Sequence, residues 1–307
     1  MTDRVQTGPP GRPIGLAAAI AAMVLSAACW GFATVMSKGA LAAFSPPLLV
    51  SLQLIASVGF LWLMVAATRR PVTLDRNTRL SALSGLLEPG LSYAVGTFGL
   101  LLTTAGNASL IATTEPLLIA VLAWLFFRER ITAGTALAIL IAMAGVAMVT
   151  GAHGAGSTQS PLGDALVVLG TLFAALYVVA SSRLVTTIDP ATLAALQQSV
   201  GLAFTLAVLF VWMSPEGIQA DLARANARMI ALALVSGIVQ YALAFWLYLI
   251  GLKRLPASTA ALFLTLTPVF GIGGAALFLG ESVTPIQAIG TLVIIASVAF
   301  ASQRART

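Results

Sequence analysis

Residues 105–132 read AGNASLIATTEPLLIAVLAWLFFRERIT, and residues 257–284 read ASTAALFLTLTPVFGIGGAALFLGESVT. The two stretches align without a gap at an offset of 152 positions. When both are extended through the apolar run that follows, 15 of the 46 aligned positions are identical. The shared positions include Thr113/Thr265, Pro116/Pro268, Phe126/Phe278 and Glu129/Glu281. Alanine- and leucine-rich chains match less often than this by chance, so the chain contains an internal repeat.

The repeat continues toward the start of each copy. Further matches occur at an offset of 152 and then of 144, namely Ser84/Ser236, Gly85/Gly237, Glu88/Gln240 and Gln53/Gln197. Connecting loops of different length explain the change of offset. We therefore divide the chain into a tail over 1–14, a first copy over 15–151 and a second copy over 161–302.

The composition places both copies in a membrane. Of the 307 residues, 59% are hydrophobic and only 8% are charged, whereas a soluble protein carries about 25% charged residues. So little charge cannot cover the surface of a soluble globule, which excludes soluble enzymes and nucleic-acid binders. The lipid bilayer is the expected surroundings, and the net charge of +6 is expected to report topology rather than an anionic partner.

Ten apolar stretches are long enough to cross a bilayer, which takes about 20 residues per helix. They cover 15–36, 46–67, 79–101, 105–127, 133–151, 162–182, 190–213, 228–251, 256–279 and 285–302. The links between them are short and carry proline, glycine or charge, so consecutive helices are expected to be antiparallel. The sequence thus predicts an all-α membrane protein with ten transmembrane helices.

Five spans per copy is an odd number, so the second copy enters the membrane from the opposite face. This predicts two inverted five-helix repeats around a central cavity, an arrangement that many secondary transporters use. Basic residues divide 13 to 3 between the two sides. The larger group is Arg4, Arg12, Arg69, Arg70, Arg76, Arg79, Arg128, Arg130, Arg183, Lys253, Arg254, Arg304 and Arg306. Because cytoplasmic loops retain lysine and arginine, we expect both termini to be cytoplasmic, in a bacterial inner membrane.

Cofactor and enzyme chemistry have little support in the sequence. Cys29 is the only cysteine and His153 the only histidine, so we expect no disulfide, no metal site and no cofactor. The chain has no GxxxxGK[ST] loop, which argues against ATP as the direct energy source. An intramembrane enzyme and a channel are the alternatives to a secondary transporter, and the spans offer neither a histidine nor a metal cluster for catalysis.

The repeated motif is similar to one known family. Glu115-Pro116-Leu117-Leu118, followed by Phe126-Phe127-Arg128-Glu129-Arg130, resembles the EamA-type repeat of the drug/metabolite transporter superfamily. Trp30-Gly31 resembles that family's start, although the second copy has Tyr177-Val178 there. The nearest resemblance is to the bacterial aromatic amino-acid exporters. It implies ten helices, a central cavity and export of small metabolites, with drugs or other metabolites as alternative substrates.

Two acidic residues lie deep in predicted spans. An ionised group in hydrocarbon costs about 2.5–3.5 kcal/mol on insertion scales, so it needs a reason. Glu88 lies in the middle of its predicted helix, on a face that it shares with Ser84, Gly85, Ser92 and Gly96. Either this face packs closely on a neighbouring helix, with Glu88 bonded to an amide, or Glu88 lines the cavity and binds an ammonium group or a proton.

Glu115 has the same two interpretations, and it precedes Pro116. Proline removes a backbone donor and kinks a helix. Thr267-Pro268 repeats the kink without the acid, so Pro116 and Pro268 are predicted kinks or hinges. Glu129 and Glu281 lie at span ends, and we expect them to be interfacial or to serve helix ends rather than to bind substrate.

Amides and aromatic residues complete the candidate substrate site. Gln53, Gln197 and Gln240 are candidates for substrate contacts, and bonds between helices are the alternative for them. Aromatic rings too central for an interfacial belt belong to Trp30, Tyr93, Tyr177 and Tyr241. An aromatic wall beside a few polar groups suits a small amphipathic metabolite such as an amino acid, and stacking on the rings favours one with an aromatic side chain.

Overall fold

The computed structural model describes residues 14–304, apart from 69–71, 73–74, 103–107, 109–110, 151–159 and 281. All secondary structure in these ranges is helical. The first copy contains α1 (Leu16–Ala40), α2 (Pro46–Ala67), α3 (Arg76–Ala82), η1 (Leu83–Leu86), η2 (Leu87–Leu91), α4 (Ser92–Leu102), α6 (Glu115–Phe127) and α7 (Ala133–Thr150). The second contains α8 (Pro161–Leu184), α9 (Pro190–Trp212), α10 (Pro215–Arg224), α11 (Ala227–Gly237), η3 (Ile238–Leu243), α12 (Ala244–Leu252), α13 (Ala257–Leu264), α14 (Thr267–Leu279) and α15 (Pro285–Arg304).

Eight helices in the described part of the chain are long and apolar enough to cross a membrane, where the sequence predicts ten spans. The other two expected spans are 79–101 and 105–127. The first is divided among α3, η1, η2 and α4, and the second is described as a helix of 13 residues from Glu115 to Phe127. Proline explains the division of the first, because Pro89 interrupts the helical hydrogen bonds.

Several long helices begin with proline at the first turn. Pro46, Pro161 and Pro190 hold this position in α2, α8 and α9. Proline suits the first turn because its missing N–H has no intrahelical partner there. Asp189 also caps α9, where its side chain accepts a hydrogen bond from the amide of Ala191 at 3.1 Å. These starts fix where each helix enters the bundle.

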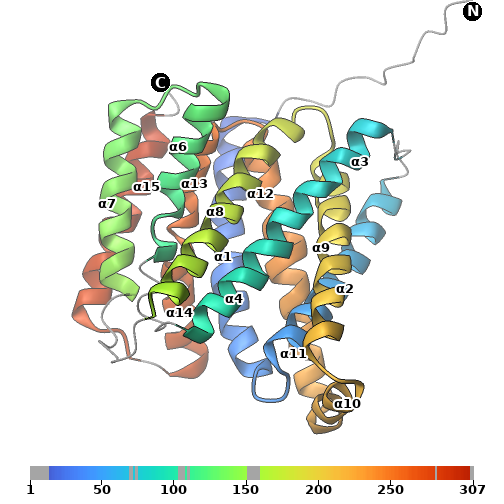
Figure 1. The fold of residues 1–307 in the computed structure, drawn as a ribbon. Coiled ribbons are helices and arrows are strands. Elements are labelled where there is room, and N and C mark those ends of the chain that lie inside the picture. The colour runs from blue at the N-terminus through green and yellow to red at the C-terminus, as the bar shows by residue number, and fades with distance from the viewer. Residues whose placement is uncertain are drawn as a thin grey trace, which may run out of the picture.

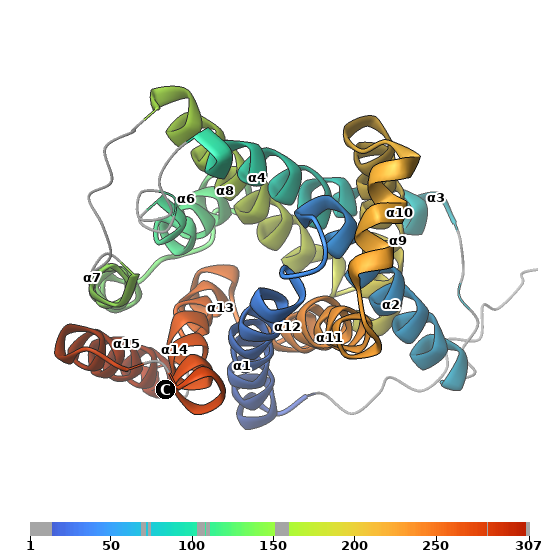
Figure 2. The same ribbon diagram turned by 90° about the horizontal axis from the view of Figure 1, so that it is seen from below.

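The helices form one bundle in which corresponding elements of the two copies lie side by side. In Figure 2, seen along the bundle, α7 lies beside α15 on one side and α2 lies near α9 on the other; both pairs are in close contact. α1 packs on α12 and α14 of the second copy, and α8 packs on α4 and α6 of the first. Each first helix therefore joins the opposite copy, and this exchange holds the two copies together.

Both ends of the described chain lie at the same end of the bundle. α1 begins and α15 ends at the top of Figure 1, and we call this the terminal end. α10 and the α1–α2 turn lie at the opposite end. A core of large buried side chains connects both copies and includes Met23, Tyr177, Phe245, Leu249 and Phe263.

The sequence pattern predicts one continuous helix through Glu88, and this is wrong. Glu88 has extended backbone angles, with φ −148° and ψ 129°, inside the π-helical segment η2. The residue before a proline disfavours the α-helical region for steric reasons, and Pro89 follows Glu88. The predicted face of Glu88 is consequently split: Gly85 approaches the backbone of α9, whereas the backbone of Ser92 and Gly96 lies against Gly170 of α8.

Candidate functional site

A cavity of about 520 Å³ lies between the two copies, within the size range of small-molecule sites. Both copies contribute to its wall, through α1, η2, α4, α6, α7, α8, η3, α12, α13 and α14. Its polar and aromatic lining comprises Trp30, Thr34, Glu88, Tyr93, Thr113, Glu115, Thr150, Tyr177, Gln240, Phe245, Tyr248, Thr265 and Thr267. A pocket between repeats, with few polar groups on an apolar wall, is a typical site for a transported molecule.

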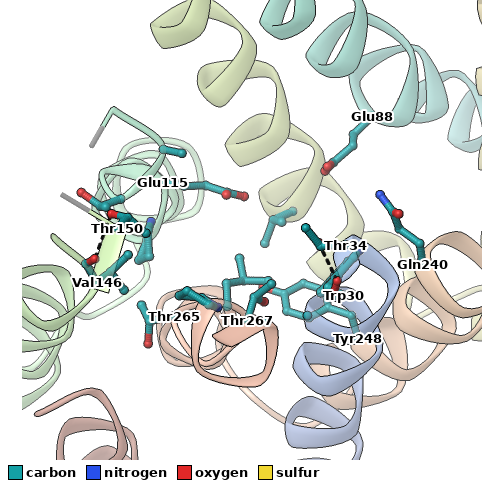
Figure 3. Close-up of a pocket in the computed structure, with 18 of the residues that line it drawn as sticks. Trp30, Thr34, Glu88, Glu115, Val146, Thr150, Gln240, Tyr248, Thr265 and Thr267 are labelled. Atoms are coloured by element: carbon teal, nitrogen blue, oxygen red, sulfur yellow. Dashed lines mark hydrogen bonds between the residues drawn. The ribbon is translucent and has the colours of Figure 1, made fainter. Parts of the chain in front are cut away.

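Two carboxyl groups face this cavity from two different elements. Glu88 comes from the irregular segment η2, and Glu115 is the first residue of α6. Figure 3 shows both side chains directed into the cavity from different sides. Among the described residues of the lining there is no lysine, arginine or histidine. Both acidic candidates from the sequence are thus brought to one cavity without a basic residue in its described wall.

An amide and several hydroxyl groups supply the neutral polar contacts. Gln240, from η3, lies across the cavity from the carboxyl of Glu115 in Figure 3. Its Oε1 accepts a hydrogen bond of 3.2 Å from the hydroxyl of Ser37, which fixes the oxygen and leaves the amide NH₂ for other contacts. Thr34 donates its hydroxyl hydrogen to the carbonyl of Trp30 at 2.9 Å, so its oxygen retains acceptor capacity toward the cavity.

Aromatic rings form a connected wall at one side. Trp30 meets Phe245 and Tyr248 edge-on, with ring centroids 5.2 and 5.6 Å apart. Tyr177 meets Phe245 in the same way at 5.6 Å. Such pairs contribute about 0.5–1.5 kcal/mol each beyond burial of their area. The rings therefore hold each other in place and preform the wall.

Tyr248 is a cavity residue that the sequence reasoning left out of the site. It lines the cavity, it is 1% exposed, and its hydroxyl has no hydrogen-bond partner among the described residues. The signal was present in the sequence, because Tyr248 follows Gln240 by eight residues, a little over two helical turns, on the same face. A buried tyrosine hydroxyl normally finds a partner, and a bound molecule would supply one.

Three candidates lie outside the cavity lining. Gln53 donates from Nε2 to the hydroxyls of Ser37 and Ser236, at 2.8 and 2.9 Å. Gln197 is also fully buried, and its contacts join α9 to two other helices. Tyr241 is buried against Tyr93, with ring centroids 5.6 Å apart. The structure places all three in contacts between helices, so it favours the packing alternative for both glutamines.

The two prolines lie where helices begin again. α13 ends at Leu264 and α14 starts at Thr267, with Pro268 in its first turn. Pro116 likewise stands in the first turn of α6. Both prolines line the cavity. Each break puts irregular backbone at the cavity wall, where it is tolerated in a membrane protein.

A side chamber of about 260 Å³ extends from the main cavity between α4, α6 and α8. Glu88 and Glu115 line both spaces. Apart from Tyr93, the remaining wall consists of small or apolar residues, namely Ser92, Gly96, Ala112, Val167, Gly170, Thr171 and Ala174. A bound molecule can therefore meet the carboxyl groups while its apolar part occupies this chamber.

At the terminal end of the bundle, Glu129 joins the two copies. Its carboxylate accepts hydrogen bonds from the backbone amides of Ala257 and Ser258, at 3.2 and 3.0 Å, and from the Ser258 hydroxyl. Glu129 follows α6 and these acceptor contacts cap the start of α13. It therefore serves a helix end, which is one of the two roles that the sequence predicts, although the helix belongs to the other copy. Glu281 lies outside the described residues.

Comparisons with known proteins agree with this architecture. Residues 17–151 and 161–303 each match the model of the EamA-like transporter family. An uncharacterized transporter of Bacillus subtilis, YvbV, is 28% identical over 90% of this chain and 89% of its own length. An uncharacterized transporter of Archaeoglobus fulgidus is 24% identical over 85% of this chain and 90% of its own. A solved crystal structure shares the fold, with a TM-score of 0.76 and 19% identity over 92% of this chain and 98% of that chain.

Proposed function

Because the chain belongs to the EamA-like transporter family, we propose that it is a secondary transporter that exports small amphipathic molecules by alternating access. The observation that carries this proposal is the cavity between the two copies, with two carboxyl groups, an amide and an aromatic wall. Few polar groups on an apolar wall bind and orient a small molecule. The transport mechanism requires that this cavity opens to each side of the membrane in turn.

The proposal includes ten spans in two inverted repeats. The broken segment from α3 to α4 and the segment that ends in α6 would then cross the bilayer beside the eight long helices. Support comes from the family match in two successive parts of the chain and from the exchange of first helices between copies. With both termini in the cytoplasm of a bacterium, as the basic residues favour, the terminal end is the cytoplasmic side of the inner membrane.

The described conformation is then one that is closed toward the cytoplasm. Tyr177 and Phe245 line the cavity and belong with Phe263 to one packed core, and Glu129 joins the copies at the terminal end. Thr34 and Thr150, in contrast, place the cavity in the half nearer the opposite end, since α7 ends at Thr150. Export requires that the contacts at the terminal end open to load substrate.

Amino acids, aromatic ones among them, are the substrates that the sequence favours. An amino group can bond to Glu88 or Glu115, and a ring can pack against Trp30 or Tyr93. Drugs and other metabolites with an amino group and an apolar part fit the same description. The names of the relatives given above include no substrate.

Reconstitution in liposomes tests the function. Uptake is measured for amino acids, sugars and cationic drugs, with and without a pH gradient. A carrier gives saturable flux for some members of the panel and competition among them. Flux that rises linearly with concentration, together with single-channel currents, would instead indicate a channel, and absence of flux for every class would contradict the proposed function.

A further inference from the structure

We infer that the cavity recognises an organic cation: an ammonium group without an accompanying carboxylate, held between Glu88 and Glu115 beside the aromatic wall. This inference rests on the proposed function and narrows its substrate class. It ranks simple amines above the zwitterionic amino acids that the sequence alone favours. The observations that support it are the charges of the lining, the rings, an unpartnered hydroxyl and the side chamber.

The charges of the lining are the first observation. Glu88 and Glu115 both face the main cavity and the side chamber, and neither forms a hydrogen bond or ion pair with another described residue of the protein. Two carboxyl groups in one low-dielectric space repel each other when both are ionised. A cationic ligand relieves this repulsion and supplies the missing partner to both groups.

A zwitterion fits the same lining less well. Its ammonium group gains the contacts just described, but its carboxylate enters the same space as Glu88 and Glu115. The described lining offers that carboxylate only neutral donors, such as the amide of Gln240 and the hydroxyl of Thr267, and no lysine or arginine. Like charges placed close together at a binding site weaken binding strongly, so the carboxylate of an amino acid is a disadvantage here.

The aromatic wall is the second observation. The faces of tryptophan and tyrosine rings attract ammonium groups, most strongly where water is excluded. Trp30, Tyr93, Tyr177 and Tyr248 all line the cavity. The unpartnered hydroxyl of Tyr248 adds an oxygen that can accept a hydrogen bond from an ammonium N–H. Rings together with carboxyl groups are a favourable combination for an organic cation.

The side chamber supplies room for the rest of such a molecule. It adjoins both carboxyl groups, and the small residues Gly96 and Ala174 form part of its wall. The volumes of about 520 and 260 Å³ accommodate an aromatic amine of the size of a drug fragment. The ammonium group would lie at the junction of the two spaces, and the apolar body would extend into one of them.

Matched ligand pairs test the inference directly. Phenethylamine and phenylalanine differ only in the carboxylate, as do tryptamine and tryptophan. Binding to the purified full-length protein in nanodiscs is measured by calorimetry, and uptake into liposomes is measured in parallel. We expect each amine to bind at least about tenfold more tightly than its amino acid, since the repulsion removed is that of like charges at close range.

Substitution of the carboxyl groups identifies the source of the preference. Glu88→Gln and Glu115→Gln should each reduce the tenfold preference, and the double variant should bind amine and amino acid about equally. The amide is suited to this environment, because Gln240 holds the position equivalent to Glu88. Glu216→Gln, on the exposed surface of α10, is the matched control and should leave the preference unchanged. A thermal melt of each variant excludes loss of fold, and the single variants suffice if the double variant does not fold.

The outcomes separate this inference from the proposed function. Equal or tighter binding of the amino acid in the wild type overturns the inference, as does a preference that survives in the variants, or no binding by any of the four compounds. If amino acids are transported without a preference for amines, the transport function stands and the cation inference fails. If amines bind with the expected preference but nothing is transported, the cation site stands and the transport function fails.

Discussion

Gln53 donates a hydrogen bond to Ser236 of the other copy at 2.9 Å, and Gln197 donates one to Ser84 of the other copy at 2.8 Å. Both glutamines also bond to a serine that lies 16 positions earlier in their own copy, Ser37 and Ser181. The same two contacts thus occur in each copy, four in all, and exchange of the copies relates one pair to the other. The bonds between copies join α2 to α11 and α9 to η1, where Gly237 and Gly85 lie directly against the backbone of Gln53 and Gln197.

These contacts should contribute measurably to stability. Gln197 has one further bond, since its Oε1 accepts a hydrogen bond of 3.0 Å from the Tyr177 hydroxyl. Bonds between helices in membrane proteins average about 0.6 kcal/mol each, so Gln197→Leu should destabilise the protein by about 2 kcal/mol and Gln53→Leu by somewhat less. Thermal unfolding in detergent measures the difference. Gln219→Leu on exposed α10 is the control, and equal stability of all three variants would contradict a joining role.

The alignment of the two copies predicted that these glutamines form a pair, because Gln53 and Gln197 occupy equivalent positions. Their role was not predictable from the sequence. An amide at this depth can bind a substrate in a cavity or form a hydrogen bond to a neighbouring helix, and its chemistry suits both. Which of the two roles applies depends on which serines lie close to each glutamine, and helix packing determines that. The same holds for Tyr248, whose place on the face of Gln240 is visible in the sequence, whereas its unpartnered hydroxyl is not.

The position of Glu88 shows a second limit of structure prediction from the sequence. Hydrophobicity and spacing predict a straight helix through it, and a steric rule about the residue before proline predicts the opposite. The local rule prevailed, because a break at a cavity leaves no backbone group facing lipid. Glu115, Trp30 and Tyr177 were predicted from depth and repeat position, and the structure brings all of them to one wall.

Topology provides the simplest prediction. A reporter fused after Thr307 should lie in the cytoplasm, and an epitope inserted at Gly156 should lie on the opposite side, because five spans separate the start of the chain from that loop. Selective labelling of intact and permeabilised cells checks this. Labelling of both positions from the same side would contradict ten spans.

The contacts of Glu129 should keep the terminal end closed. Loss of a capping side chain costs about 1 kcal/mol, and here the capped helix belongs to the other copy. Glu129→Ala should therefore increase opening at this end. The measurement is maleimide labelling of Phe263→Cys in a Cys29→Ser background, since Phe263 is 1% exposed and absent from the cavity lining. Labelling should rise severalfold over the parent. Glu216→Ala should have no such effect, and an unchanged rate for Glu129→Ala would show that the packed rings alone close this end.

Acid should weaken the contact between α10 and the start of α2. Burial by itself raises the pKa of Asp221, but the hydrogen bond from the Ser45 amide, 2.8 Å long, and the charge of Arg224 hold that pKa below its usual value. A lowered pKa in the folded state stabilises the protein above the unfolded value of about 3.9, and this contribution is lost as pH falls through the folded value.

The comparison of wild type with Asp221→Asn isolates this contribution. The wild type should be more stable than the variant at pH 6, and the difference should shrink as the pH is lowered below about 4. Unfolding midpoints measured across this range give the difference at each pH. A constant difference at all pH values would mean that the charge of Asp221 contributes nothing and that only its hydrogen bonds matter.

Trp30 should determine how strongly aromatic substrates are preferred. Its ring is held by Phe245 and Tyr248 at the cavity wall, so a bound ring or ammonium group meets a surface that is already ordered. A ring pair contributes about 0.5–1.5 kcal/mol and a desolvated cation–ring contact about 2 kcal/mol. Trp30→Ala should consequently lower the affinity for tryptamine or tryptophan by about 10-fold or more, and that for small aliphatic substrates less.

Trp124→Ala is the matched control, because Trp124 is 49% exposed on α6 and lies outside the cavity lining. Trp30→Phe should retain most of the preference, since phenylalanine keeps a ring at the same place. Removal of Trp30 also takes two ring contacts from the wall, so a loss of stability is expected alongside the loss of affinity. An equal loss of affinity for aromatic and aliphatic substrates would assign Trp30 to packing alone, because a packing role affects the shape of the whole cavity rather than its preference for rings.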